Sequence, residues 1–193
     1  MKKTYFLVAL LTIGMTIANA QEMTDKLPYH QIPDYPEKFT AETVAARMVD
    51  GLGFRYHWAT EGLTAKDLEY RPSDMARSSR ETIEHILGLT TTMVNAIKMQ
   101  SNERIDYSSM TFEELRAQTL QNIKESSDIL RNAKPGSLEN YKMKFSKEFP
   151  FWNLINGPIA DAIWHVGQVV SFRRASGNPY NSKASVFTGK LRE

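Results

Sequence analysis

The sequence predicts an all-α protein, a four-helix bundle with a long crossover connection between helices 3 and 4. Four segments carry apolar residues at helical spacing, and no segment shows a convincing strand alternation. A long stretch without helical periodicity separates the last two of these segments, which is typical of bundles with a crossover. No internal repeat at a fixed period is present, which argues against a repeat architecture.

The first twenty residues are expected to be a signal peptide. Lys2 and Lys3 precede a mostly apolar run, and Ala18-Asn19-Ala20 supplies the small residues that signal peptidase requires. The apolar run is too short for a membrane span. We therefore expect cleavage after Ala20, a periplasmic or secreted protein, and no membrane anchor.

The composition excludes several functional classes. The signal peptide contains two of the 24 Lys and Arg residues and none of the 22 Asp and Glu residues, so the mature chain would carry no net charge. A nucleic-acid partner is not expected, because it requires a clustered basic surface. The chain has no cysteine, which excludes disulfides and thiolate ligands or nucleophiles. It also lacks a G-x-S-x-G elbow and a glycine-rich phosphate loop.

The mature chain is expected to begin with an extended lead-in over residues 21–40, which contains three prolines and no periodicity. A first helix is predicted over residues 41–62. Gly51 and Gly53 weaken this helix, since each costs about 1 kcal/mol relative to alanine. Its apolar stripe is predicted to consist of Val44, Met48, Leu52, Arg55 and Ala59.

Capping boxes predict where the second and third helices begin. The second helix starts with SSRE and covers about residues 78–100, after a turn that contains an Arg-Pro pair. The third starts with TFEE at Thr111 and ends at Lys134, where Pro135-Gly136 interrupts the helical pattern.

The crossover connection covers residues 134–157 and is rich in aromatic residues, so we expect it to wrap around the core. The fourth helix is predicted to have Pro158 in its first turn and to end at Gly177. The tail, residues 180–193, is polar and is expected to pack loosely.

Two further features are assigned structural roles. We expect Arg173 and Arg174 to cap the fourth helix rather than to bind a substrate anion. The aromatic residues around Phe149 and Trp152 could form an interaction surface, but they are more simply a cover over the core.

The chain has four histidines, two of which have no strong functional signal. His30 lies in the lead-in and is expected to be an ordinary surface residue. His57 shares a face of the first helix with Asp50 and Glu61. We favour a solvated polar face here, with a site residue as the alternative.

The other two histidines lie at the margins of buried helix faces. Asp161 and His165, in DAIWHVGQVVSFRR, are one turn apart on the fourth helix, and His85 lies at the edge of the second. They could form a three-ligand site for zinc, nickel or iron(II) with open positions, or a hydrogen-bonded pair in a core. Spacing alone favours the pair. Gln168 and His57 are candidate catalytic residues that support the ligands or transfer protons.

Three stretches resemble the DinB-like family of small metal-binding four-helix bundles. The first is GLTAKDLEYRPSDMARSSRETIEHI, residues 62–86, and the second is ADAIWHVGQVVSFRRASGNP, residues 160–179. Arg55 and Trp58 also stand where the family often has an arginine and an aromatic residue. The resemblance extends over most of the mature chain and implies a DinB-like domain at residues 41–179.

The resemblance implies a metal ion held by three residues. His85 and His165 match two of the family's three usual histidine ligands, and Asp161 stands at the third position. Mycothiol-dependent maleylpyruvate isomerases in the wider superfamily are similar in placing a carboxylate there. The implied function is a metal-dependent hydrolase or transferase of unknown small-molecule substrate, since known activities in the family involve low-molecular-weight thiols.

A non-catalytic bundle with a structural or vestigial metal site is the alternative to this enzyme. A second copy of the chain, in a homodimer, remains an open alternative for a partner.

Overall fold

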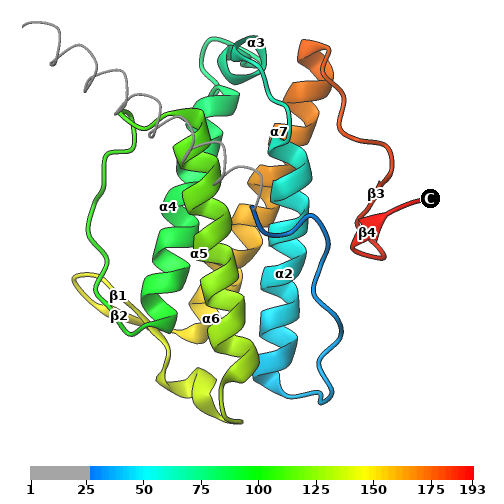
Figure 1. Ribbon diagram of the computed structural model, residues 1–193. Coiled ribbons are helices and arrows are strands. Elements are labelled where there is room, and N and C mark those ends of the chain that lie inside the picture. Colours follow the sequence, from blue (N-terminus) through cyan, green and yellow to red (C-terminus); the bar gives the residue numbers. More distant parts are fainter. Residues whose placement is uncertain (1–26) are drawn as a thin grey trace, which may run out of the picture.

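The computed structural model describes residues 27–193 and shows an all-α protein (Figure 1). The signal peptide expected at residues 1–20 lies outside the described residues. Four long helices lie side by side: α2 (Ala41–Thr60), α4 (Ser79–Ile97), α5 (Phe112–Asn132) and α7 (Ala160–Ser176). No described helix combines the length and the apolar character that a bilayer span requires.

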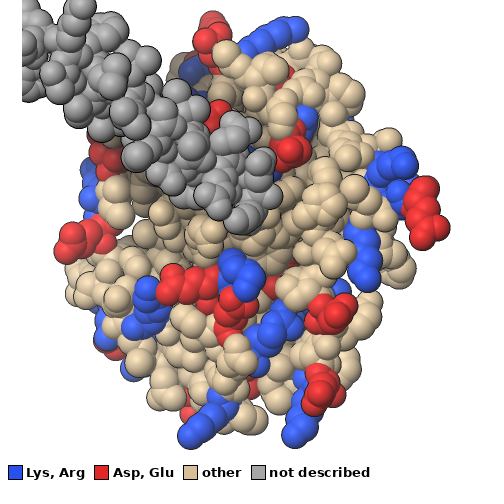
Figure 2. Space-filling model, viewed as in Figure 1, with Lys and Arg blue, Asp and Glu red and all other residues tan. Residues whose placement is uncertain are grey.

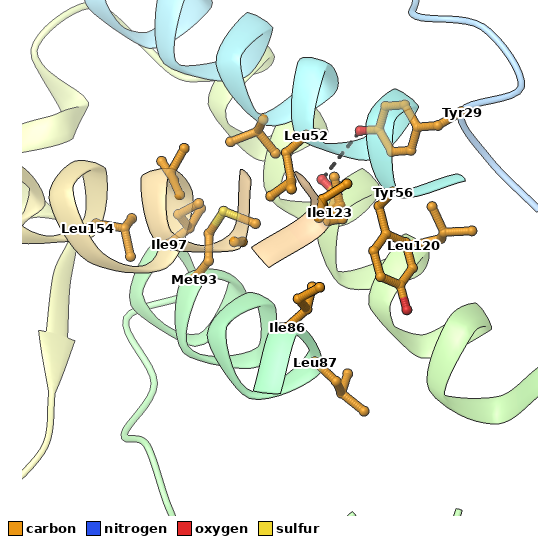
Figure 3. Close-up of a cluster of buried hydrophobic side chains, with 14 of the residues drawn as sticks. Tyr29, Leu52, Tyr56, Ile86, Leu87, Met93, Ile97, Leu120, Ile123 and Leu154 are labelled. Atoms are coloured by element: carbon orange, nitrogen blue, oxygen red, sulfur yellow. Dashed lines mark hydrogen bonds between the residues drawn. The ribbon is translucent and has the colours of Figure 1, made fainter. Parts of the chain in front are cut away.

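Each long helix packs against two of the others. α2 and α4 both contact α5 on one side and α7 on the other. The core lies between the four helices, as Figure 3 shows. Removing each large aliphatic or aromatic side chain from water contributes about 1.5–3 kcal/mol, so this core is the main source of stability. Its largest fully buried members include Leu52, Tyr56, Ile86, Met93, Leu120 and Ile123.

The predicted capping boxes of α4 and α5 are present. The Ser78 hydroxyl accepts a hydrogen bond from the backbone N–H of Glu81, and the Glu81 carboxylate accepts one from the backbone N–H of Ser78. Thr111 and Glu114 make the same reciprocal pair at α5. These local bonds satisfy donors that a helix start leaves free, which is why the starts could be predicted.

The predicted apolar stripe of α2 is wrong in its first half. The side chains of Val44 and Met48 are 47% and 39% exposed, whereas Leu52 and Ala59 are buried. Because α2 packs between α5 and α7, the buried face of its first half is displaced around the helix. The residues buried there are Glu42, Ala45, Ala46, Val49 and Asp50.

The lead-in packs against the face of α2 that was predicted to be solvated. Tyr29 is buried, and its hydroxyl donates to the Asp50 carboxylate over 3.1 Å. The fully buried Asp50 also accepts from Ser127 and forms an ion pair with Arg131. A Cβ on Gly53 would lie 2.5 Å from the Tyr29 ring, so this glycine allows the lead-in to approach the helix.

The connection after α5 contains regular structure of its own. It forms a 3-10 turn (Ser137–Asn140) and an antiparallel hairpin of β1 (Lys142–Lys144) and β2 (Glu148–Pro150), with Met143 opposite Phe149. Helical structure then resumes in α6 (Phe151–Leu154), earlier than predicted. The hairpin therefore leads directly into the last helical stretch.

Pro158 does not lie in the first turn of a helix as predicted. It lies in a π-helical turn, Ile155–Ile159, between α6 and α7. Proline has no N–H to donate, and its ring would clash with the carbonyl four residues earlier in a regular α-helix. A wider π-helical turn is one way to accommodate it.

The tail is ordered, so the expectation of loose packing is wrong. It forms a second small hairpin of β3 (Ala184–Ser185) and β4 (Lys190–Leu191), which lies beside α2 in Figure 1. Ala184 packs with Phe54 and Trp58 of α2 and with Ile32 of the lead-in. The short α3 (Ala65–Glu69) precedes α4.

Candidate metal centre

Three predicted ligands come together between α4 and α7. The Nε2 atom of His85 lies 3.4 Å from one carboxylate oxygen of Asp161, and the Nε2 atom of His165 lies 3.4 Å from the other. One ligand atom from each residue can be chosen so that all three lie within 4.8 Å of one another. This group could hold a metal ion.

The separations fit a small divalent cation. Bonds of about 2.0–2.1 Å in tetrahedral geometry place neighbouring ligand atoms about 3.3 Å apart. Each nitrogen–oxygen distance of 3.4 Å is close to that value. A direct N–H···O hydrogen bond is usually shorter, about 2.7–3.2 Å. The two distances end on different oxygens of one carboxylate, so Asp161 reaches both imidazoles at separations compatible with a shared cation.

Gln168 determines which nitrogen of His165 is available to bind a metal ion. Its side-chain oxygen lies 2.7 Å from Nδ1 of His165 and accepts a hydrogen bond from that atom. In the neutral ring, Nε2 then carries a lone pair that faces the Asp161 carboxylate. Two lone pairs facing each other require a proton or a metal ion between them. Partners of this kind on metal-binding histidines fix the ring tautomer.

The site is accessible to solvent. The side chains of His85 and Asp161 are each 33% exposed, and that of His165 is 13% exposed. The two imidazole rings meet edge to face, with centroids 4.6 Å apart. The three side chains are therefore in contact with solvent rather than enclosed in the core.

The electrostatic environment keeps His85 neutral. Partial burial lowers the pKa of His85, and the positive charge of Arg77 lowers it further, although the Asp161 carboxylate opposes both effects. A neutral imidazole is the form that binds a metal ion. His85 is therefore available as a ligand at neutral pH.

The π-helical turn lies directly before the residues that α7 contributes. It ends at Ile159, two residues before Asp161. Turns of this type often occur at functional sites because they change the direction in which the following side chains point. Gly157-Pro158 was the available sequence signal, but we interpreted it as an ordinary helix start.

Trp164 was also missed. It is largely exposed, and its ring lies parallel to that of His165 with centroids 6.4 Å apart. An exposed aromatic residue beside a predicted ligand could have been recognised from the sequence, since the two are adjacent.

His57 lies in a different cluster, and its predicted solvated environment is wrong. It is buried, and its Nδ1 atom donates to the backbone oxygen of Pro28 over 2.8 Å. Burial lowers the pKa of His57. Its ring also packs against those of Trp58 and the exposed His30. His57 belongs to the contact between α2 and the lead-in rather than to the His85–Asp161–His165 group.

Arg173 binds backbone oxygens at a helix end, as predicted, but at the end of α2 rather than of α7. Its guanidinium donates to the backbone oxygens of Trp58 and Ala59 at the end of α2, and also to Asn178. It therefore joins the carboxyl ends of α2 and α7. Arg174 takes no part in these bonds.

Comparison with known proteins identifies no relative. No family model matches this chain, and no match was found among curated proteins or solved structures.

Proposed function

We propose that this protein is a secreted DinB-like four-helix bundle that binds one divalent metal ion through His85, Asp161 and His165. Zinc, nickel and iron(II) all accept this set of imidazole and carboxylate ligands. One observation carries the proposal: Nδ1 of His165 donates to Gln168, so its Nε2 lone pair faces the carboxylate at 3.4 Å. A bound cation would satisfy both groups.

The packing of the long helices supports the bundle. α2, α5, α4 and α7 form a closed ring of neighbours, in which each helix contacts the next. The connection from α5 to α6 contains the β1–β2 hairpin, and we assign it as the crossover of the proposed bundle. In this arrangement, one ligand comes from α4 and two come from α7, as the resemblance to the DinB-like family implies.

The proposed activity is metal-dependent hydrolysis or group transfer on a small-molecule substrate. A divalent ion held by three protein ligands supplies a Lewis acid and lowers the pKa of water beside it. Asp161 supplies negative charge that balances part of the ion's charge, and Gln168 orients His165. The exposed edges of His85 and Asp161 leave one side of the site open to a substrate.

Metal content tests the proposal directly. The chain is purified without a metal-binding tag, loaded separately with zinc, nickel and iron(II), and analysed for bound metal. We expect about one ion per chain for at least one of these metals. His85→Ala and His165→Ala should lose it, and the exposed-histidine control His30→Ala should retain it. Substoichiometric metal in the unmodified chain with all three ions would overturn the proposal.

A second measurement separates a catalytic site from a structural one. Cobalt(II) replaces the metal, and its visible absorption is recorded while azide is added. A spectral change shows a coordination position open to exogenous ligands, as an enzyme requires. An unchanged spectrum would indicate a closed structural site and would contradict the proposed activity while leaving metal binding intact.

A further inference from the structure

A cavity lies on the opposite side of α7 from the candidate metal ligands. It has a volume of about 580 Å³ and is bordered by α7, α2 and the C-terminal tail. Three arginines line it: Arg55 from α2, Arg174 from α7 and Arg192 from the tail. None of the lining residues is acidic. We call this the arginine cavity.

The arginines of this cavity differ from the paired arginines elsewhere. Arg116 pairs with Glu61, and Arg131 pairs with Asp50. Within residues 27–193, by contrast, no carboxylate oxygen lies within 4.0 Å of a guanidinium nitrogen of the three cavity arginines. Among the described residues, Arg55 donates a hydrogen bond only to the backbone oxygen of Gly51. Like charges gathered in one cavity repel one another, and a bound anion would relieve that repulsion.

The hydroxyl of Tyr180 adds a polar group in the same region. It is buried and makes no hydrogen bond with any of the described residues. Burial raises the pKa of Tyr180, while the positive charges of Arg55 and Arg174 oppose that rise, so the hydroxyl lies in the field of the arginines. A buried hydroxyl without a partner costs about 1–3 kcal/mol, and a ligand oxygen could accept its hydrogen bond.

The rest of the wall is mostly apolar. Ile163 and Val170 line it from α7, and Val186 lines it from the tail. At Gly167, which also lines the cavity, an added Cβ would meet no atom within 4 Å. The cavity therefore combines a cationic part with an apolar part, and its volume lies in the range of about 300–1,000 Å³ that is usual for small-molecule sites.

We propose that the arginine cavity binds a small organic carboxylate with an apolar body. The carboxylate interacts with the guanidinium groups of Arg55 and Arg174, which are suited to planar oxyanions. The alkyl or aromatic body lies along Ile163 and Val170. The site is separate from the metal ligands, because Gly167 is about 160° around α7 from His165 at 100° per residue.

Octanoate is the probe for this proposal, and its binding to the full chain is measured by calorimetry. Octan-1-ol has the same body without the charge, and acetate has the charge without the body. We expect octanoate to bind at least about tenfold more tightly than either compound, because both parts of the cavity contribute. Equal affinity for octan-1-ol would overturn the ionic part of the proposal. Tighter binding of inorganic phosphate would overturn the assignment to carboxylates.

Two variants locate the site. Gly167→Leu fills the cavity without changing any charge, and it should fold because leucine favours a helix more than glycine does. We expect it to abolish octanoate binding. Arg174→Gln should weaken binding about tenfold through the loss of a charge-assisted hydrogen bond. Arg104→Gln removes an exposed charge outside the cavity and should have no effect.

The outcomes of these variants are distinct. If Arg104→Gln and Arg174→Gln weaken binding equally, the effect comes from net charge and the proposal is wrong. If Gly167→Leu binds octanoate as the unmodified chain does, the ligand lies elsewhere. Far-ultraviolet circular dichroism, measured on the same samples, reports whether each variant is folded and does not depend on either proposed site.

Discussion

The two sides of α7 differ in how their charges are balanced. Towards α4, the carboxylate of Asp161 lies between two imidazoles, so acceptors gather where a cation could bind. On the side that borders α2 and the tail, arginines gather without an acidic residue in the cavity wall. One side is therefore suited to a metal ion and the other to an organic anion.

The difference also concerns how each side is built. The side that carries the candidate metal ligands is built from α4 and α7. Helical spacing sets the positions of its residues, and Gln168 orients the ring of His165. The arginine side is completed by the tail, which is held by Ala184 and by a hydrogen bond from the Ile32 N–H to the Gly189 oxygen. A change in the tail should therefore affect only one side of α7.

The strongest test of this separation is Asp161→Asn. Loss of the carboxylate should reduce the bound metal, for whichever of the three ions the unmodified chain retains, from about one ion per chain to below about 0.1, because a neutral amide is a poor ligand for these ions. Octanoate binding should be unchanged. The control, Asp74→Asn, alters an exposed carboxylate and should retain the metal. Loss of octanoate binding in Asp161→Asn would show that the two sides are coupled.

A smaller effect is expected at Gln168. Gln168→Ala leaves the three ligands in place but frees His165 to rotate and change tautomer. We expect zinc affinity to fall about 10- to 100-fold, as measured by competition with a chelating dye. Gln168→Glu keeps an acceptor for Nδ1 of His165 and should restore most of the affinity. Equal affinities for Gln168→Ala and the unmodified chain would contradict the role assigned to Gln168.

The attachment of the tail is tested at Gly189. This residue has a φ of +70°, and an added Cβ would lie 2.7 Å from the Ile32 side chain. Gly189→Ala should cost about 1–2 kcal/mol for the left-handed backbone alone. The overlap with Ile32 adds to this, so the tail should loosen and octanoate should bind more weakly, with zinc binding unchanged.

Gly62→Ala is the matched control for that measurement. Gly62 has a φ of +66°, but an added Cβ there meets no atom within 4 Å. The difference in unfolding free energy between the two variants therefore isolates the contact of the tail with Ile32. If Gly62→Ala is as destabilising as Gly189→Ala, that contact is unimportant.

The smallest expected effect is a pH dependence from His57, which lies on neither side of α7. Burial lowers its pKa in the folded protein, so the unfolded chain binds the proton more tightly. Stability should therefore fall as the pH drops from about 6.5 through the folded pKa of His57. His57→Asn should reduce this slope in chemical denaturation of metal-free protein, because asparagine does not titrate. An unchanged slope in His57→Asn would contradict this assignment.

The sequence predicted those features that depend on local patterns. The capping boxes at Ser78 and Thr111 are formed within four residues, and Asp161 and His165 are one helical turn apart. Both kinds of pattern can be recognised without knowing the fold. Local spacing does not connect His85 with Asp161 and His165. That prediction also required the resemblance to the DinB-like family.

Long-range packing of irregular segments could not be predicted in the same way. Asp50 and His57 were assigned to a solvated face because nothing near them in the sequence indicates burial. Their partners include Tyr29 and Pro28, which lie in a lead-in without periodicity. The tail was missed for the same reason, and with it the cavity that Arg55 and Arg174 border.

The π-helical turn has a consequence for how α7 could have acquired both of its sides. A π-helical turn contains one residue more than an α-helical turn, so it is equivalent to a single-residue insertion. Deletion of one residue within Ile155–Ile159 would rotate all of α7 by about 100° relative to α6. Asp161 would then no longer lie beside His85, and Arg174 would no longer line the same cavity as Arg55. One additional residue in the π-helical turn therefore sets the rotation of α7 about its axis. That rotation places the residues of both sites, the metal ligands and the arginine cavity, in their positions.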